Sequence, residues 1–294
     1  MSVANSTKLN LSAGAASVAM AVVLVGLKLW ALGETGALSV AASLADSAMD
    51  LMVSLAAMAA LIYAAKPADE DHAFGHTSAE DLAALTQAVF VLISAGVIAW
   101  IAVARLLAEQ PSRLQAEGPG MAVMSISVVL TLLLVWWQGR VARRTGSRVV
   151  AADRLHYLGD LLPNLGAIAS LWASKAYAMG AIDSVVALTA AVVMAVGALR
   201  IGKGAWDALM DRTADAEIVA GIAAIAETWP GVHGFHDLKT RTAGSRVFVN
   251  LHIELDGSQS LREAHAIGAS LRRAILNAYP QADVIIHKDV VRET

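Results

Sequence analysis

Cysteine is absent from this 294-residue chain, and charged residues are scarce. Without cysteine the chain forms neither disulfides nor thiolate metal sites, so a bound metal would have to be held by His, Asp or Glu. Charged residues make up 16% of the chain, against about a quarter in soluble domains. Hydrophobic residues reach 57% and the mean hydropathy is +0.58, which is typical of a membrane protein.

The motifs of several enzyme classes are missing as well. The sequence contains neither the HExxH pair of a zinc protease nor the Walker A loop of an ATP-driven pump. No Ser–His or Cys–His constellation indicates covalent catalysis. We therefore expect neither an enzyme nor a cofactor. The polar residues 1–10 lack the features of a signal peptide, so the first apolar segment is expected to be retained.

Six apolar segments are long enough to cross a bilayer, which takes about 20 residues. An even number of spans places both termini on one side, and basic residues mark that side as cytoplasmic. One connector on that side carries Arg140, Arg143, Arg144 and Arg148, which we interpret as a topology signal and not as a nucleic-acid contact. The predicted spans are Leu11–Leu32, Leu38–Tyr63, Leu82–Leu107, Met121–Gln138, Val149–Ala176 and Ile182–Ile201.

After about Lys203 the sequence becomes charged and takes on the periodicity of a soluble domain. The order α-β-β-α-β predicts a small α+β sandwich of the ferredoxin or metallochaperone type, with helices on one sheet face. A domain of about 80 residues is small for an independent core, so dimerisation through it is expected. The predicted elements are a helix at Ala214–Thr228, strands at Gly234–Arg241 and Arg246–Leu255, a helix at Leu261–Ala278 and a strand at Val284–Ile286.

Two of the apolar segments carry polar residues on one helical face. The fifth and second segments repeat the same offsets of 0, 3, 4, 7 and 11, the spacing of a helix face. Neither stripe holds a Lys or Arg, although each ionised carboxylate at mid-bilayer costs about 2.5–3.5 kcal/mol or more. The stripes are Asp153, His156, Tyr157, Asp160 and Asn164 in the fifth segment, and Ser43, Asp46, Ser47, Asp50 and Ser54 in the second.

A divalent cation would neutralise these carboxylates. The second and fifth segments run in opposite directions, so Asp50 can lie level with His156 and Asp46 with Asp160. We predict a four-ligand site of these residues, which suits tetrahedral Zn²⁺ and also accepts Fe²⁺, Cd²⁺, Co²⁺ or Mn²⁺. A proton relay that uses the same residues is the alternative. Asp153 and Asn164 are interpreted as access and packing residues.

These features resemble the cation diffusion facilitator family over nearly the whole chain. The resemblance implies an antiporter that moves Zn²⁺, or Fe²⁺ or Cd²⁺, out of the cytoplasm as protons enter. The chemistry agrees, because Asp and His must be deprotonated to bind metal and metal therefore competes with protons. The stretches that carry the resemblance are Ala45–Asp50, His72–His76, Leu155–Asp160 and Asp283–Asp289.

The resemblance also implies further site residues. Leu155 matches a hydrophobic gate position, with an ordinary core- or lipid-facing leucine as the alternative. Ser78 and Lys288 depart from the Lys and Gln expected there, which puts an ion pair near Asp211 and one tail ligand in doubt. The implied metal positions are Asp69, His72 and His76 in a cytoplasmic loop, whose alternative is a solvated acidic loop, and His236, His252, His265, His287 and Asp289 in the tail.

The expected organisation therefore has three parts. Residues 1–10 form a cytoplasmic tail, 11–208 a six-helix transmembrane transport domain, and 209–294 a cytoplasmic metal-binding regulatory and dimerisation domain. We expect a homodimer in a bacterial inner membrane, in contact with lipid and with both termini cytoplasmic. Its partners would be divalent metal ions and protons. A membrane metal sensor that does not transport, or a manganese-selective member of the same family, remains the alternative.

Overall fold

The computed structural model describes the chain except for residues 1–2, 36–37, 108–117, 160, 162–181 and 292–294. The side chain of Asp46 and those of some other helical residues also lie outside the described part. The chain forms two compact units. One comprises Lys8–Trp206, and the other comprises Met1–Thr7 together with Asp207–Thr294.

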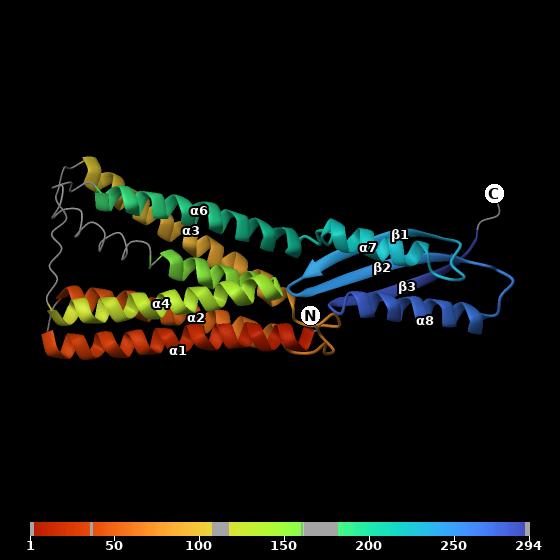
Figure 1. Ribbon diagram of the computed structural model, residues 1–294, viewed down its shortest axis with the longest axis horizontal. Coiled ribbons are helices and arrows are strands. Elements are labelled where there is room, and N and C mark those ends of the chain that lie inside the picture. The colour runs from red at the N-terminus through yellow and green to blue at the C-terminus, as the bar shows by residue number, and fades with distance from the viewer. Residues whose placement is uncertain (1–2, 36–37, 108–117, 160, 162–181, 292–294) are drawn as a thin grey trace. The chain divides into compact units, whose positions relative to one another are not determined.

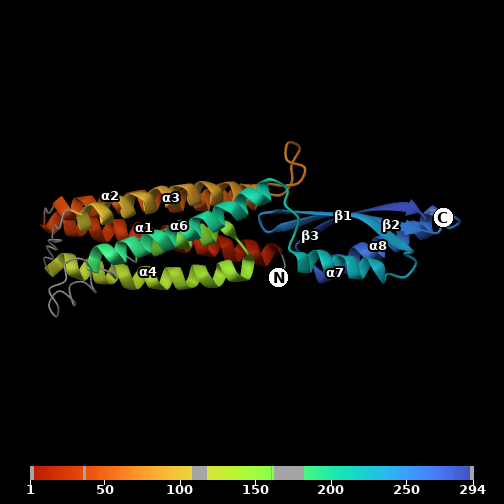
Figure 2. The same ribbon diagram turned by 90° about the horizontal axis from the view of Figure 1, so that it is seen from above.

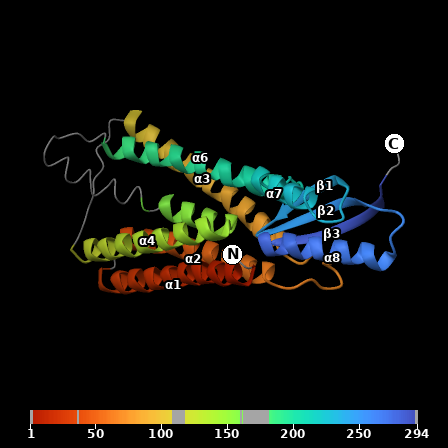
Figure 3. The same ribbon diagram turned by 45° about the vertical axis from the view of Figure 1, so that its right-hand side comes forward.

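The larger unit is helical. Five helices of the described chain are long and apolar enough to cross a membrane, and they run lengthwise beside one another (Figures 1 and 3). The predicted span Val149–Ala176 is described only in its first part, where residues 148–159 are helical. We call residues 148–159 the fifth-helix segment. The other helices are α1 (Val3–Thr35), α2 (Leu38–Ala64), α3 (Ser78–Leu107), α4 (Gly118–Thr145) and α6 (Ile182–Leu209).

Small side chains lie where these helices meet. Ala13 of α1, Ala57 of α2, Ala84 of α3 and Ala205 of α6 share one buried cluster with valines of α4 and of the fifth-helix segment. Small residues let helix backbones approach closely, which is how helices pack when lipid removes the hydrophobic drive for their association. Large apolar side chains are instead exposed along the outside of the helices, as lipid contact requires.

The smaller unit has a three-stranded sheet covered on one face by two helices (Figure 2). The strand order is β1-β2-β3, with β1 and β2 antiparallel and β2 and β3 parallel. This confirms the predicted α-β-β-α-β order. The elements are α7 (Ala216–Glu227), β1 (Gly234–Ala243), β2 (Arg246–Leu255), α8 (Leu261–Ala278) and β3 (Ala282–Val290).

Local sequence explains these elements. Alternate residues of β2 are buried against α7 and α8, with Leu251 and Ile253 in the core beside Leu271 and Ile275. Ser260 and Glu263 form a reciprocal capping box that starts α8 at the predicted residue. The strand β3 extends well beyond the predicted Val284–Ile286, because its polar residues pair with β2 as far as Leu255.

Candidate metal sites

The two polar stripes meet inside the helical unit. Nε2 of His156 lies 3.1 Å from Oδ1 of Asp50, and the two side chains are only 8% and 18% exposed. The ring of Phe90, from α3, lies edge-on to the imidazole at 5.8 Å between centroids. This contact joins α2 to the fifth-helix segment at the predicted level. It supplies one imidazole nitrogen and one carboxylate, both suitable ligands for a transition metal.

The other two predicted ligands are only partly placed. Asp46 lies in α2 one helical turn before Asp50, but its side chain is outside the described part of the structure. Asp160 and Asn164 are both outside it. The four-ligand set of Asp46, Asp50, His156 and Asp160 therefore stays a prediction.

Three further stripe residues, Asp153, Tyr157 and Ser54, belong to a buried polar network. Oδ2 of Asp153 accepts hydrogen bonds from Ser17 Oγ at 2.5 Å and Gln138 Nε2 at 2.7 Å. One turn further on, the Tyr157 hydroxyl lies 2.9 Å from Ser54 Oγ and donates to the Ser17 carbonyl at 3.3 Å. Asp153 is only 3% exposed, so in this conformation it packs against α1 and α4 and does not line an open access route.

Leu155 packs between α3 and α6. It shares a buried cluster with Val91, Met194 and Ala198. A Cβ at Gly197 would lie 2.9 Å from Leu155 Cδ2, so a larger residue there would displace the Leu155 side chain. These contacts place Leu155 in the core of the described helices, and the gating role stays a prediction.

The loop between α2 and α3 brings its three predicted ligands together. Asp69 Oδ1 lies 3.2 Å from His72 Nδ1, and Asp69 Oδ2 lies 3.3 Å from His76 Nε2. The Nδ1 atom of His76 lies 3.2 Å from the Pro67 carbonyl oxygen, which can only accept, so this contact favours the tautomer in which Nε2 has its lone pair available for a metal. The backbone N–H of His72 donates to Asp69 and holds the pKa of that carboxyl below its usual range. A positive φ of 82° at Gly75 lets the loop turn back onto Asp69.

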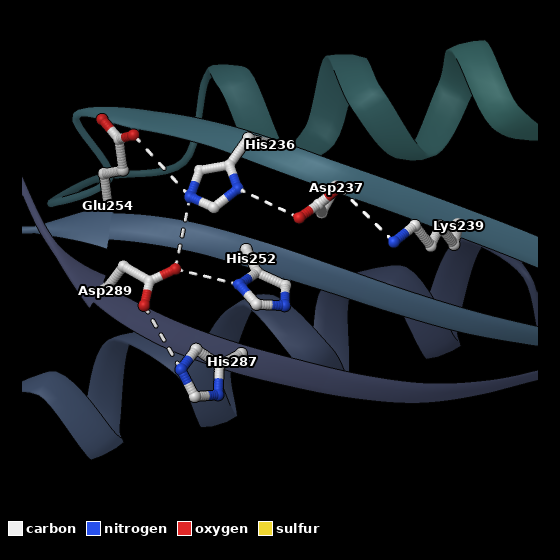
Figure 4. Close-up of polar contacts among 7 residues, drawn as sticks. All are labelled: His236, Asp237, Lys239, His252, Glu254, His287 and Asp289. Carbon is white, nitrogen blue, oxygen red and sulfur yellow. Dashed lines mark hydrogen bonds and ion pairs between the residues drawn. The ribbon is translucent and has the colours of Figure 1, made fainter.

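Three histidines cross the tail sheet in a row (Figure 4). His236 of β1 pairs with His252 of β2, which pairs with His287 of β3. Asp289 contacts all three, at 3.2 Å from His236 Nε2, 2.9 Å from His252 Nδ1 and 3.2 Å from His287 Nε2. The hydrogen bond with His252, aided by the other histidines, lowers the pKa of Asp289. One carboxylate among three imidazoles is a donor set for one or two transition-metal ions.

The chain does not bring His265 to this row. His265 is exposed on α8, which covers the core face of the sheet, whereas the row lies on the opposite face. Lys288 also points toward α8, since a Cβ at Gly268 would lie 2.6 Å from its Cε. A Gln at position 288 would occupy the same face. Lys288 therefore removes no ligand from the row within one chain.

The ion pair expected near Asp211 takes a different form. Asp211 pairs with Arg241 of β1 at 3.2 Å, within the tail unit. Ser78 begins α3, and its hydroxyl brings no charge.

Comparison with known proteins identifies the family. The family model described as the cation efflux transmembrane domain matches residues 15–210. The chain belongs to the cation efflux family. A second family model, the cation efflux protein cytoplasmic domain, matches residues 214–290. The resemblance seen in the sequence is therefore confirmed, and the chain is a multi-pass membrane transporter of metal cations with a dimerisation-type tail.

Relatives of this cation efflux protein include several called cation-efflux pump FieF. The one from Klebsiella pneumoniae is 39% identical over 277 residues, covering 94% of this chain and 91% of that protein. The one from Pectobacterium atrosepticum is 41% identical over 279 residues, covering 95% and 92%.

Two of the solved structures that resemble this chain cover about a quarter of it. The metal-bound C-terminal domain of the CzcD transporter from Thermotoga maritima is 29% identical, with 26% of this chain and 92% of that chain covered and a TM-score of 0.26. The zinc form of the zinc transporter CzrB is 32% identical, with 29% and 100% covered and a TM-score of 0.27. Because both scores are low, the family assignment rests on the sequence matches.

Two acidic residues beside the histidine row of the cation efflux tail were not predicted. Asp237 adopts a positive φ of 50° where the β1–β2 register shifts, and its Oδ2 lies 3.8 Å from His236 Nδ1. Glu254 Oε1 lies 3.8 Å from His236 Nε2. The sequence holds one usable signal, the spacing His252-x-Glu254, which puts both side chains on one strand face.

Proposed function

We propose that this cation efflux protein exports a divalent transition metal ion from the cytoplasm in exchange for protons, by alternating access. Zn²⁺ is the cargo that the donor set fits best, with Fe²⁺ and Cd²⁺ as further candidates. The protein would work as a homodimer in a bacterial inner membrane, with both termini cytoplasmic. The observation that carries the proposal is the buried contact of 3.1 Å between His156 Nε2 and Asp50 Oδ1.

Proton exchange is supported by the chemistry of that contact. An imidazole nitrogen binds a metal only when it is deprotonated, and so does a carboxylate. Each ligand takes up a proton when the metal leaves, and it releases a proton to the solution when metal binds again. If the site opens in turn to the two sides of the membrane, metal and protons move in opposite directions.

The loop cluster and the tail row fit cytoplasmic metal sites. Asp69, His72 and His76 offer three ligand atoms that all lie within 4.8 Å of one another, and so do His252, His287 and Asp289. Metal on the tail row would tie three strands together by their side chains. We propose that the tail binds cytosolic metal in this way and strengthens the dimer when metal is plentiful.

Flux in proteoliposomes tests the proposal. Purified chain would be reconstituted with a zinc dye inside and a pH gradient across the membrane. We expect Zn²⁺ and proton movement in the parent and at least a hundredfold loss in Asp50→Ala and Asp160→Ala. Asp215→Ala is the matched control, because Asp215 is exposed and makes no side-chain capping bond.

Three results would contradict parts of the proposal. Equal flux in Asp50→Ala and Asp215→Ala would remove Asp50 from the transport site. Zinc flux without proton movement would exclude antiport. A parent that binds zinc but shows no flux would favour the non-transporting sensor.

A further inference from the structure

A lysine from a helix outside the two stripes contacts the stripe of α2. Lys28 lies in α1, within the apolar span Ala4–Glu34. Its Nζ donates to Ser47 Oγ in α2 at 2.6 Å. Ser47 is only 1% exposed, and it lies between Asp46 and Asp50 on the carboxylate stripe. The sequence placed no cation on these stripes, and the structure brings one to them from α1.

The direction of this side chain is unusual for a membrane lysine. Ser17 and Ser54 lie at one level, because Tyr157 contacts both. At 1.5 Å per residue, Lys28 is about 16 Å along α1 from Ser17, whereas Ser47 is about 10 Å along α2 from Ser54. Lysines near helix ends ordinarily extend outward to the polar interface. Lys28 instead bridges this offset of about 6 Å by extending toward the middle of the bundle.

The distance from Lys28 to the predicted metal ligands determines how strongly its ammonium repels a bound cation. Asp50 follows Ser47 by three residues on the same helix face, a rise of about 4.5 Å. An ammonium at Ser47 is therefore less than about two helical turns from a cation held by Asp50 and His156. Between partly buried charges at that separation, the interaction of a unit charge with a divalent ion changes binding by about tenfold or more.

We infer that Lys28 is a fixed internal cation of the transport site. It offsets the carboxylate charge while no metal is bound. When a divalent ion is bound, it lowers the affinity of the site, so that the ion is released faster. This inference rests on the proposed transport function. Lys28 touches Ser47 and acts on the site through charge, so it is a positioning and affinity-setting residue and not a metal ligand.

The test compares charge removal with charge retention. Lys28→Met removes the cation and keeps much of the side-chain length, Lys28→Arg keeps the charge, and Lys8→Met is a matched control on an exposed lysine of the same helix. All arms would carry His72→Ala and His252→Ala in the full chain, so that calorimetry in detergent reports the intramembrane site. Zinc flux in proteoliposomes would give kcat and KM.

We expect Lys28→Met to lower both the Kd for Zn²⁺ and KM by tenfold or more and to lower kcat, while Lys28→Arg and Lys8→Met stay within threefold of the parent. An unchanged Kd in Lys28→Met would overturn the inference. Equal effects of Met and Arg would also overturn it, because they would point to packing and not to charge. If Lys28→Met does not fold, Lys28→Gln makes the same comparison.

The outcome is separable from that of the transport proposal. Flux that survives in Asp50→Ala refutes the transport site. An unaltered zinc affinity in Lys28→Met refutes only the internal cation.

Discussion

The polar network around Asp153 makes a quantitative stability prediction. Gln138 is fully buried, and its Nε2 donates to Asp153 Oδ2 at 2.7 Å and to Ser17 Oγ at 2.8 Å. Its Oε1 has no hydrogen-bond partner among the described residues. Gln138→Leu therefore removes the two hydrogen bonds that Nε2 donates, and no hydrogen bond that Oε1 accepts from a described residue. A hydrogen bond contributes about 0.5–1.5 kcal/mol to stability, and Gln138 Nε2 makes two of them, so we expect a loss of about 2 kcal/mol.

A double-mutant cycle isolates the bond from the change in side-chain packing. In an Asp153→Ala background, Gln138 keeps only its bond to Ser17, so Gln138→Leu costs about 1 kcal/mol there, which predicts a coupling energy of about 1 kcal/mol. Gln87→Leu is the matched control, because Gln87 is buried and neither amide atom has a hydrogen-bond partner among the described residues. We expect that control to be neutral or stabilising.

Unfolding in mixed micelles, followed by tryptophan fluorescence, would measure both the loss of stability in Gln138→Leu and the coupling energy. For a chain of this size about 2 kcal/mol corresponds to a fall of about 4–8 °C in Tm. Two outcomes would refute the reasoning. One is additivity of Gln138→Leu and Asp153→Ala within about 0.5 kcal/mol, and the other is an equal loss in Gln87→Leu.

Three further predictions concern the other polar groups. Asp289→Asn should weaken tail metal binding at least tenfold by calorimetry, because one carboxylate serves three histidines, whereas Asp283→Asn on the same strand face should leave it unchanged. The pKa of Asp69 is lowered, so this carboxylate stays ionised from pH 8 to 5 and its contribution is lost only below that window. Since metal displaces protons from imidazole ligands, Cd²⁺ binding at the loop should weaken as the pH falls, and binding that is flat with pH would contradict the site. Asp81 is only 1% exposed, and Arg148→Met removes the guanidinium that pairs with it at 2.6 Å. We expect this substitution to destabilise the protein by about 3–5 kcal/mol. The double variant Arg148→Met/Asp81→Asn should recover stability, which checks the reasoning.

Helix periodicity carried most of what the sequence revealed about the membrane part. The i, i+3 and i, i+4 spacing of the stripes identifies a face without any tertiary information, so the meeting of Asp50 and His156 could be predicted. The capping residues Ser260 and Glu263 likewise fixed the start of α8. Local signals of this kind depend on neighbours within one turn.

Contacts that depend on packing between elements were not predictable in the same way. The direction of Lys28 follows from how α1 sits beside α2, which no pattern within α1 encodes. The same holds for Ser17 and Gln138, whose partner Asp153 lies far away in the chain. In the tail, a shared residue type suggested that His265 joins the other histidines, but the face of the sheet decides which of them meet.

The row of histidines also depends on the register of the three strands. His236, His252 and His287 are mutual partners across an antiparallel and a parallel ladder. Because side chains alternate between faces, a slip of one residue in any strand would send one imidazole into the core and break the row. Metal ions held between neighbouring strands, by His236 with His252 and by His252 with His287, would therefore select the native strand alignment. Metal would then favour the correctly aligned sheet when the tail folds, in addition to any effect on the dimer.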